Sequence, residues 1–179
     1  NEAARESITK KYGILFQGAA LFDSMNIYDN VAFGMRRKGV PEDEIARAVP
    51  EMLGQVGLKD IEEKKPSELS GGMQKRAGLA RSIAIRPEIM IYDEPTTGVD
   101  PITGGAVDRL ILDMRDTYGI TSIVVTHDMN SAYRTADRIA MLHQGKIIFT
   151  GTPEEIKQHD NEIVRQFVEG RAHGPISID

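Results

Sequence analysis

The chain has 179 residues, of which 40% are hydrophobic and 27% are charged, as expected for a folded protein of one domain or slightly more. Its 22 basic and 27 acidic side chains give a net charge of −5, which argues against a general binder of nucleic acid or anionic membranes. The absence of cysteine excludes disulfides, thiol catalysis and thiolate metal sites, and no apolar run is long enough to span a bilayer.

The first half of the chain predicts one strand followed by helices. An apolar run at residues 13–17 is typical of a short buried strand, and residues 28–38 are expected to be helical. Pro41 and the three acids after it predict a helix start, and apolar residues at helical spacing continue this helix to Val56. Pro50 lies inside that pattern and is expected to kink or divide the helix.

From residue 88 the pattern changes to strands that alternate with helices. Residues 88–93 and 121–126 predict two buried strands, with a helix at 101–118 between them. A hairpin is expected at 139–149, and a capping box at 152–155 predicts a further helix. This alternation indicates an α/β protein with a parallel sheet, in which the helix-rich segment after the first strand is an insertion.

The most informative segment is Leu69-Ser-Gly-Gly72, at the start of a predicted helix. The Ser70 hydroxyl, the unpaired backbone N–H groups and the positive end of the helix dipole together predict an anion site suited to a phosphate. Gly71 and Gly72 would let a ligand approach the backbone closely. A simple N-cap role also explains Ser70, so both interpretations stay open at this point.

Two adjacent acids, Asp93 and Glu94, follow the second buried strand. At the carboxyl end of a strand, this pair is typical of a site for Mg²⁺ and a nucleotide. Asp93 is expected to hold the metal, and Glu94 to polarise an attacking water as general base. Solvated acids are common at strand ends, but two together after an apolar strand are unfavourable without a cation, which favours the metal site.

Three further polar residues are informative only in combination. His127 follows the neighbouring strand and could reach a γ-phosphate, although a lone histidine there would be interpreted as structural. Gln17, at the end of the first strand, could contact Mg²⁺ or water. Asp100 is explained as an N-cap before Pro101, a role that can coexist with another.

Taken together, these residues resemble the ATP-binding-cassette (ABC) ATPases. The serine of the Leu-Ser-Gly-Gly signature lies 23 residues before the Walker B acid, which is a specific spacing. The resemblance covers about residues 13–158. In chain order, the Q-loop, signature, Walker B, D-loop and H-loop correspond to Gln17, Ser70-Gly71-Gly72, Asp93-Glu94, Asp100 and His127.

Within that family, several segments are similar to the Mla-type ATPases. Those proteins energise phospholipid transport between Gram-negative membranes and are also known as toluene-tolerance proteins. The similar segments are residues 15–22, 69–73, 100–103 and the tail from 164 to 175.

The resemblance implies an ATP- and Mg²⁺-dependent enzyme that works as a head-to-tail homodimer. Each ATP would lie between the P-loop of one subunit and the signature of the other. Ser70, Gly71 and Gly72 would bind the γ-phosphate of the partner's nucleotide. Asp93 and Gln17 would bind Mg²⁺, and Glu94 would activate the attacking water. His127 would contact the γ-phosphate, and Asp100 would lie at the contact between the two ATP sites.

The resemblance also implies a domain organisation and partners. The expected fold is a truncated P-loop NTPase core at 13–23 and 87–158, with a helical subdomain at 24–86 and a C-terminal helix and tail at 159–179. Residues 17–40 would meet the cytoplasmic loops of transmembrane permease subunits. A small accessory STAS-type protein is a further expected partner, nucleic acid is not, and the protein would be peripheral on the cytoplasmic face of the inner membrane.

The chain departs from the family in one large respect, because no G-x-x-x-x-G-K-S/T P-loop occurs in it. We therefore expect a C-terminal fragment that is inactive by itself. Met73 also replaces the glutamine common at the fifth signature position. Two alternatives are an ABC ATPase that energises something other than transport and a non-catalytic binding module, against which the presence of both Glu94 and His127 weighs.

The missing P-loop segment implies a gap in the sheet. In the family, the P-loop strand lies between the strands expected at 121–126 and 138–142. Without it, backbone groups of the 121–126 strand would lack partners. We expect either that the two strands move together or that a second chain covers the edge, and we favour self-association.

Overall fold

The computed structural model describes residues 11–177 and divides them into two units, one ending at His127 and one beginning at Asp128. The first unit is built on a sheet of three parallel strands in the order β1 (Tyr12–Leu15), β2 (Ile89–Asp93) and β3 (Thr121–Val125). All three strands were predicted, and the α/β fold with a parallel sheet is confirmed. The first strand ends two residues before Gln17, which lies in the turn after it.

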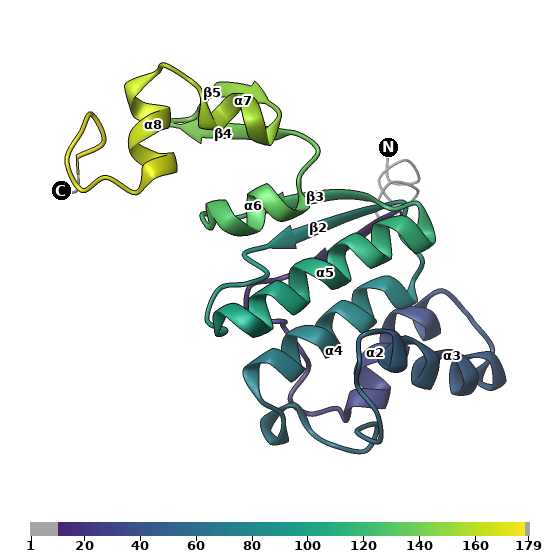
Figure 1. Ribbon diagram of the computed structural model, residues 1–179. Coiled ribbons are helices and arrows are strands. Elements are labelled where there is room, and N and C mark those ends of the chain that lie inside the picture. The colour runs from purple at the N-terminus through teal and green to yellow at the C-terminus, as the bar shows by residue number, and fades with distance from the viewer. Residues whose placement is uncertain (1–10, 178–179) are drawn as a thin grey trace. The chain divides into compact units, whose positions relative to one another are not determined.

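Helices form the remainder of the first unit (Figure 1). Between β1 and β2 lie α2 (Ile27–Arg37), α3 (Glu42–Gln55), a short 3-10 helix η1 (Pro66–Glu68) and α4 (Gly71–Ala84). Helices α2, α3 and α4 pack on one another, as expected for a helical insertion. Helix α5 (Pro101–Tyr118) connects β2 to β3 and ends at Gly119, whose positive φ of 65° suits glycine.

Helix α3 is continuous through Pro50, so the proline does not divide this helix, while the alternative expectation of a kink stays a prediction. Its apolar side, which includes Ile45, Val49 and Leu53, is fully buried in the main core. An interior proline costs a helix about 3 kcal/mol, whereas burying a single large apolar side chain contributes about 1.5–3 kcal/mol. The buried side of α3 therefore outweighs the cost of the proline.

The two faces of the sheet have different surroundings. On one face, Leu15, Met90 and Tyr92 are buried against α4 and α5 in the main core. On the other face, the register aligns Ile14, Ile91 and Ile123, and the first and last of these are 39% and 50% exposed. Packing in the first unit therefore uses one side of the sheet.

In the described part of the chain, β3 pairs with β2 alone, and the strand expected at 138–142 belongs to a separate sheet. Movement of these two strands towards each other, the alternative that was not favoured, stays a prediction. Self-association across the β3 edge stays a prediction, as do the predicted domain boundaries.

The second unit contains α6 (Met129–Thr135) and the predicted hairpin of β4 (Ile139–His143) and β5 (Lys146–Gly151). Helix α7 (Pro153–Lys157) begins at the predicted capping box of Thr152 and Glu155, and α8 (Glu162–Glu169) follows. A small apolar core fixes these elements, formed by Met141, Phe149, Ile156 and Val164. Among the described residues, no helix is both long and apolar enough to cross a membrane.

Candidate functional site: the Glu94 corner and the Ser70 turn

The Ser70 turn, residues 70–72, begins helix α4. Ser70 is the N-cap, and its hydroxyl accepts a hydrogen bond from the Met73 backbone N–H at 3.3 Å. Ser70 and Gly71 are exposed, so the first N–H groups of this 14-residue helix remain accessible to an anion. The capping role and the phosphate role are therefore compatible.

The two glycines of the turn differ in what surrounds them. A Cβ on Gly71 would meet nothing within 4 Å, which is consistent with an open approach for a ligand. A Cβ on Gly72 would lie 2.8 Å from Thr103 Cγ2, at the start of α5. The interpretation that both glycines serve the ligand is thus incomplete, because Gly72 is needed for the packing of α4 against α5.

Asp100 forms the N-cap of α5, as predicted. Its carboxylate accepts hydrogen bonds from the backbone N–H groups of Ile102 and Thr103, each at 3.0 Å, and from the Thr103 hydroxyl. These hydrogen bonds lower the pKa of Asp100 below its ordinary value, and the bond from the Thr103 hydroxyl contributes most. Because Thr103 also contacts Gly72, the structure brings the predicted signature and D-loop residues close together.

The Glu94 corner is formed by Glu94, Thr97 and His127. The Glu94 carboxylate is 19% exposed and lies 2.8 Å from His127 Nδ1 through Oε1, while the Thr97 hydroxyl donates to Oε2 at 2.9 Å. The backbone N–H of Glu94 donates to the Val125 carbonyl at 2.9 Å, which continues the β2–β3 pairing. The structure thus joins Glu94 and His127, 33 residues apart in sequence.

The backbone of Glu94 has a φ of 48°, in the left-handed region that non-glycine residues rarely adopt. Such a conformation costs about 1–3 kcal/mol and persists only where surrounding contacts hold it. The turn directs the carboxylate of Glu94 towards Thr97 and His127 rather than along the strand. Thr97 was not predicted as a site residue. The sequence signal that could have indicated it is a threonine three residues after the acid, close enough to bond its carboxylate.

A buried lysine also reaches this turn. Lys75, on α4, is 7% exposed and donates to the carbonyls of Pro95 at 3.0 Å, Glu94 at 3.4 Å and Thr97. Burial lowers the pKa of Lys75 from its ordinary value. Lys75 was not predicted as a site residue, although Lys75, Gly78, Leu79 and Ser82 follow the spacing of one buried helix face.

The residues predicted to serve Mg²⁺ lie at the same edge of the sheet but do not contact each other. Asp93 is the last residue of β2 and is partly buried, and its carboxylate has no hydrogen-bond or ion-pair partner within residues 11–177. Gln17 is exposed in the turn after the adjacent strand β1. One unpaired carboxylate suits Mg²⁺, which keeps waters and substrate phosphates as its other ligands. In the described chain, no group of three or more His, Asp or Glu side chains could hold a metal without such help.

The turn that carries Gln17 is held from α4. Arg81 donates to the carbonyls of Ala19 at 2.8 Å and Ala20 at 2.6 Å, and both alanines have positive φ values, of 61° and 47°. The Arg81 guanidinium also lies over the Phe22 ring at 5.6 Å. Helix α4 therefore contacts the turn of Gln17 through Arg81 and the turn of Glu94 through Lys75.

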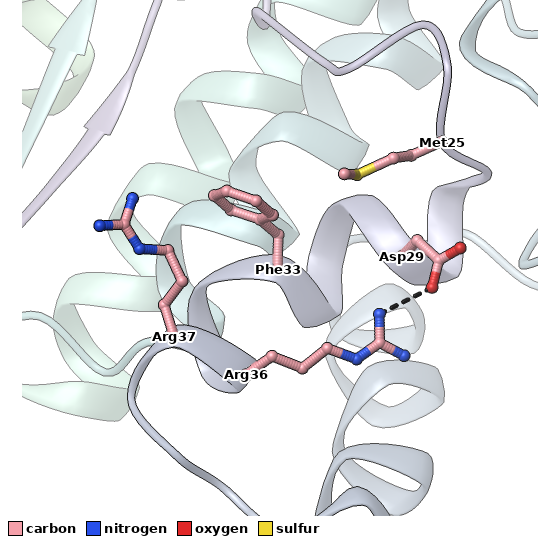
Figure 2. Close-up of a pocket in the computed structure, with 5 residues that line it drawn as sticks. All are labelled: Met25, Asp29, Phe33, Arg36 and Arg37. Carbon is pink, nitrogen blue, oxygen red and sulfur yellow. Dashed lines mark hydrogen bonds and ion pairs between the residues drawn. The ribbon is translucent and has the colours of Figure 1, made fainter.

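A separate hollow of about 470 Å³ lies on α2 and the segment before it, lined by Met25, Asp29, Phe33, Arg36 and Arg37 (Figure 2). Arg36 pairs with Asp29 at 2.8 Å and with Glu42 at 2.7 Å. Its hydrogen bond lowers the pKa of Glu42 and raises the pKa of Arg36 itself. The hollow lies within the predicted permease-facing segment, residues 17–40, and shares no residue with the Glu94 corner.

Known proteins resemble the chain in sequence. The "Probable ribonucleotide transport ATP-binding protein mkl" of Mycobacterium tuberculosis is 43% identical over 168 residues, covering 93% of this chain and 47% of that protein. "Protein TRIGALACTOSYLDIACYLGLYCEROL 3, chloroplastic" of Arabidopsis thaliana is 41% identical over 183 residues, covering 93% and 53%. The "Intermembrane phospholipid transport system ATP-binding protein MlaF" of Escherichia coli is 39% identical over 171 residues, covering 95% and 64%. The chain thus spans about half to two thirds of the length of these relatives.

A solved structure and a family model agree with these similarities. The structure of cbiO1 from Clostridium perfringens, part of the ABC transporter complex cbiONQ, matches with a TM-score of 0.81 and 31% identity. The match covers 96% of this chain and 68% of that one. The family model described as ABC transporter matches residues 1–97, more than half of the chain. The chain therefore belongs to the ABC transporter family.

Proposed function

We propose that the chain is part of the ATP-hydrolysing subunit of a transporter that moves phospholipids between bacterial membranes. The observation that carries the hydrolytic activity is the Glu94 corner, in which an acid at a strand end is held by Thr97 and His127. The Mla-type segments and the 39% identity to MlaF support a lipid as the transported substrate. The 43% identity to mkl, whose name refers to ribonucleotides, makes a ribonucleotide the competing candidate.

Glu94 acts as the general base in this proposal. A water oxygen attacks the γ-phosphorus of ATP, and a water proton passes to the Glu94 carboxylate. The bond from the γ-phosphorus to the bridging oxygen then breaks, and ADP leaves with that oxygen. Thr97 and His127 each bind one carboxylate oxygen, which fixes the carboxylate while leaving lone pairs for the water.

Asp93 and Gln17 are the residues that would hold Mg²⁺. The metal supplies charge neutralisation at the phosphates when it is bound. The carboxylate of Asp93, which has no partner within residues 11–177, and the exposed amide of Gln17, on neighbouring strand ends, support this assignment. His127 is 68% exposed beside Glu94, and this exposure supports a contact with the γ-phosphate.

The Ser70 turn serves a second subunit in this proposal. Its accessible N–H groups and hydroxyl would bind the γ-phosphate of a nucleotide held by the partner in a head-to-tail homodimer. Asp100, whose neighbour Thr103 packs on Gly72, would lie at the contact between the two sites.

Further partners follow from the same proposal. Residues 17–40, with the hollow at Phe33 and Arg37, would meet transmembrane permease subunits at the cytoplasmic face of the inner membrane. A small accessory STAS-type protein would complete the complex. The absence of a P-loop motif in these 179 residues leads us to propose that they do not hydrolyse ATP by themselves.

The test of the hydrolytic assignment is Glu94→Gln in the full-length protein. We expect turnover of Mg·ATP to fall by about 100-fold or more, because the general base is removed, while ATP still binds. Glu88→Gln is the matched control, since Glu88 is an exposed acid just before the same strand, paired with Lys11 at 3.0 Å. Near-normal turnover in Glu94→Gln, or an equal loss in Glu88→Gln, would contradict the assignment.

The transported substrate needs its own assay. The full-length protein and its permease subunits would be reconstituted in vesicles that contain a labelled phospholipid, with labelled ribonucleotide in a parallel sample. We expect ATP-dependent movement of the phospholipid, abolished by Glu94→Gln. Movement of the ribonucleotide alone would contradict the lipid assignment.

A further inference from the structure

Lys75 is a buried cation that the proposed reaction does not use. Among the lysines and arginines of residues 11–177, only Lys75 is buried, with 7% of its surface exposed. Burial of an ammonium group is unfavourable unless its donors are bonded, and a core position with only a packing role is normally apolar. A lysine at this position therefore needs an explanation beyond packing.

The three donors of the ammonium group are all directed to one turn. Lys75 Nζ donates to the carbonyls of Pro95 at 3.0 Å, Glu94 at 3.4 Å and Thr97. These three carbonyls converge at one point, where their negative ends would repel each other without a donor. An ammonium group has three donors and no acceptor, so it matches this arrangement.

The same turn sets the position of the proposed general base. Glu94 has a φ of 48°, and its carboxylate is held by Thr97, whose own carbonyl accepts from Lys75. Loss of the Lys75 bonds would free three carbonyls and allow the strained turn to relax. The Glu94 carboxylate would then move relative to His127, from which it is now 2.8 Å away.

We propose that Lys75 is a positioning residue for Glu94, which fixes the residue 94–97 turn through its three carbonyl bonds and so keeps the carboxylate beside His127. This inference rests on the proposed function of Glu94 as general base. Lys75 lies on α4, the helix that Ser70 caps, so it also joins the Ser70 turn to the Glu94 corner through one rigid element.

The test compares Lys75→Met with Arg76→Met in the full-length protein. Methionine fills similar space but donates no hydrogen bond. Arg76 is the matched control because it is the next residue of α4 and also donates to backbone carbonyls. Its acceptors are the carbonyls of Val56 and Gly57, which lie outside the turn of Glu94. We expect kcat for ATP hydrolysis to fall about 10-fold to 100-fold in Lys75→Met, with KM for ATP changed less than about 3-fold. Arg76→Met should retain kcat per folded molecule.

A spectroscopic measurement tests the position of Glu94 without using activity. Side-chain NMR signals of His127, assigned with His127→Gln, sense the neighbouring Glu94 carboxylate. We expect them to shift in Lys75→Met and to stay in place in Arg76→Met. If the wild-type protein hydrolyses no ATP, the proposed function fails, whereas an unchanged His127 signal in folded Lys75→Met overturns the positioning role.

Two further variants complete the test. Lys75→Gln keeps amide N–H donors without the charge, and we expect it to recover most of the lost kcat and the wild-type His127 signals. Should Lys75→Met not fold, Lys75→Ala replaces it, because water that enters the space satisfies the carbonyls enough for folding but does not fix the turn as the tethered ammonium group does. Wild-type kcat in either folded removal variant, or a kcat in Lys75→Gln no higher than theirs, would overturn the proposal.

Discussion

The Glu94 corner and the Ser70 turn contain residues of the same proposed reaction, but they are built in opposite ways. The functional group of the corner is bound inside the chain: both Glu94 carboxylate oxygens have partners, and the side chain is only 19% exposed. In the Ser70 turn, Ser70 and Gly71 are exposed and Gly72 is half-buried, so the start of α4 is accessible to solvent.

This difference indicates what each region needs from outside the chain. The corner already has its orienting contacts, so what it lacks is substrate and water. The turn presents exposed N–H donors that a phosphate can bind in place of water, which agrees with a site completed by the nucleotide of a second subunit. Substitutions in the corner should therefore impair hydrolysis, whereas substitutions in the turn should impair binding of the second subunit's nucleotide.

The largest expected effect of substitution at the turn is that of Ser70→Arg in the full-length protein. The new side chain places bulk and charge where the γ-phosphate would lie, so the ATP-dependent dimer should not form and turnover should be lost. Size-exclusion chromatography with light scattering would measure the dimer, and calorimetry the ATP affinity of the monomer. A dimer that forms normally in Ser70→Arg would place the turn outside the interface.

A substitution effect of intermediate size distinguishes the two glycines of the turn by the free energy of unfolding of their alanine variants. Gly71→Ala should leave the free energy of unfolding unchanged or raise it by about 0.5–1 kcal/mol, because its Cβ meets nothing within 4 Å, while turnover falls. Gly72→Ala should lower the free energy of unfolding by about 1–3 kcal/mol, because its Cβ would displace Thr103.

Thr103→Ser provides the control for this pair, since serine keeps the hydroxyl bonded to Asp100 but lacks Cγ2. Added to Gly72→Ala, it should restore most of the lost stability in urea unfolding. Equal stability of the two alanine variants would show that Thr103 does not determine the requirement for glycine.

The smallest expected effect concerns Tyr92, in the strand that leads into the corner. Its hydroxyl is buried near that of Ser122, yet neither meets hydrogen-bond geometry with a described partner. Tyr92→Phe should therefore change the free energy of unfolding at pH 7 by less than about 1 kcal/mol.

Burial raises the pKa of Tyr92 to about 12, above its ordinary value of 10. The folded state thus favours the protonated hydroxyl, and the associated stability is present below pH 10 and lost as the pH rises from 10 to 12. Urea unfolding at pH 7 and pH 11 should show a smaller decrease in Tyr92→Phe than in the wild type. Identical decreases would contradict the raised pKa.

Local patterns in the sequence were sufficient for much of the fold. Alternation of apolar runs with capping signals located β2, α5 and β3, and Asp100 is the cap that its position before Pro101 predicted. Glu94 and His127 were expected in one site only through the resemblance to ABC ATPases, and the contact between them agrees with that expectation.

Features that depend on tertiary packing were not predictable in this way. Continuity of α3 through Pro50 depends on its buried side, and the need for glycine at position 72 depends on Thr103 from another helix. Lys75 was missed because a single lysine in a helix is usually solvated, and its partners are backbone carbonyls that carry no sequence signal.

A site shared between two subunits is tested most directly by mixing two full-length proteins, one with Glu94→Gln and one with Ser70→Ala. If the Glu94 corner of each subunit works with the Ser70 turn of its partner, every mixed dimer contains one site with both residues intact. We predict that the mixture hydrolyses ATP faster than the mean of the two proteins measured separately at the same total concentration. A rate equal to that mean would show that Glu94 and Ser70 of the same chain serve one nucleotide, and would contradict a site shared between subunits.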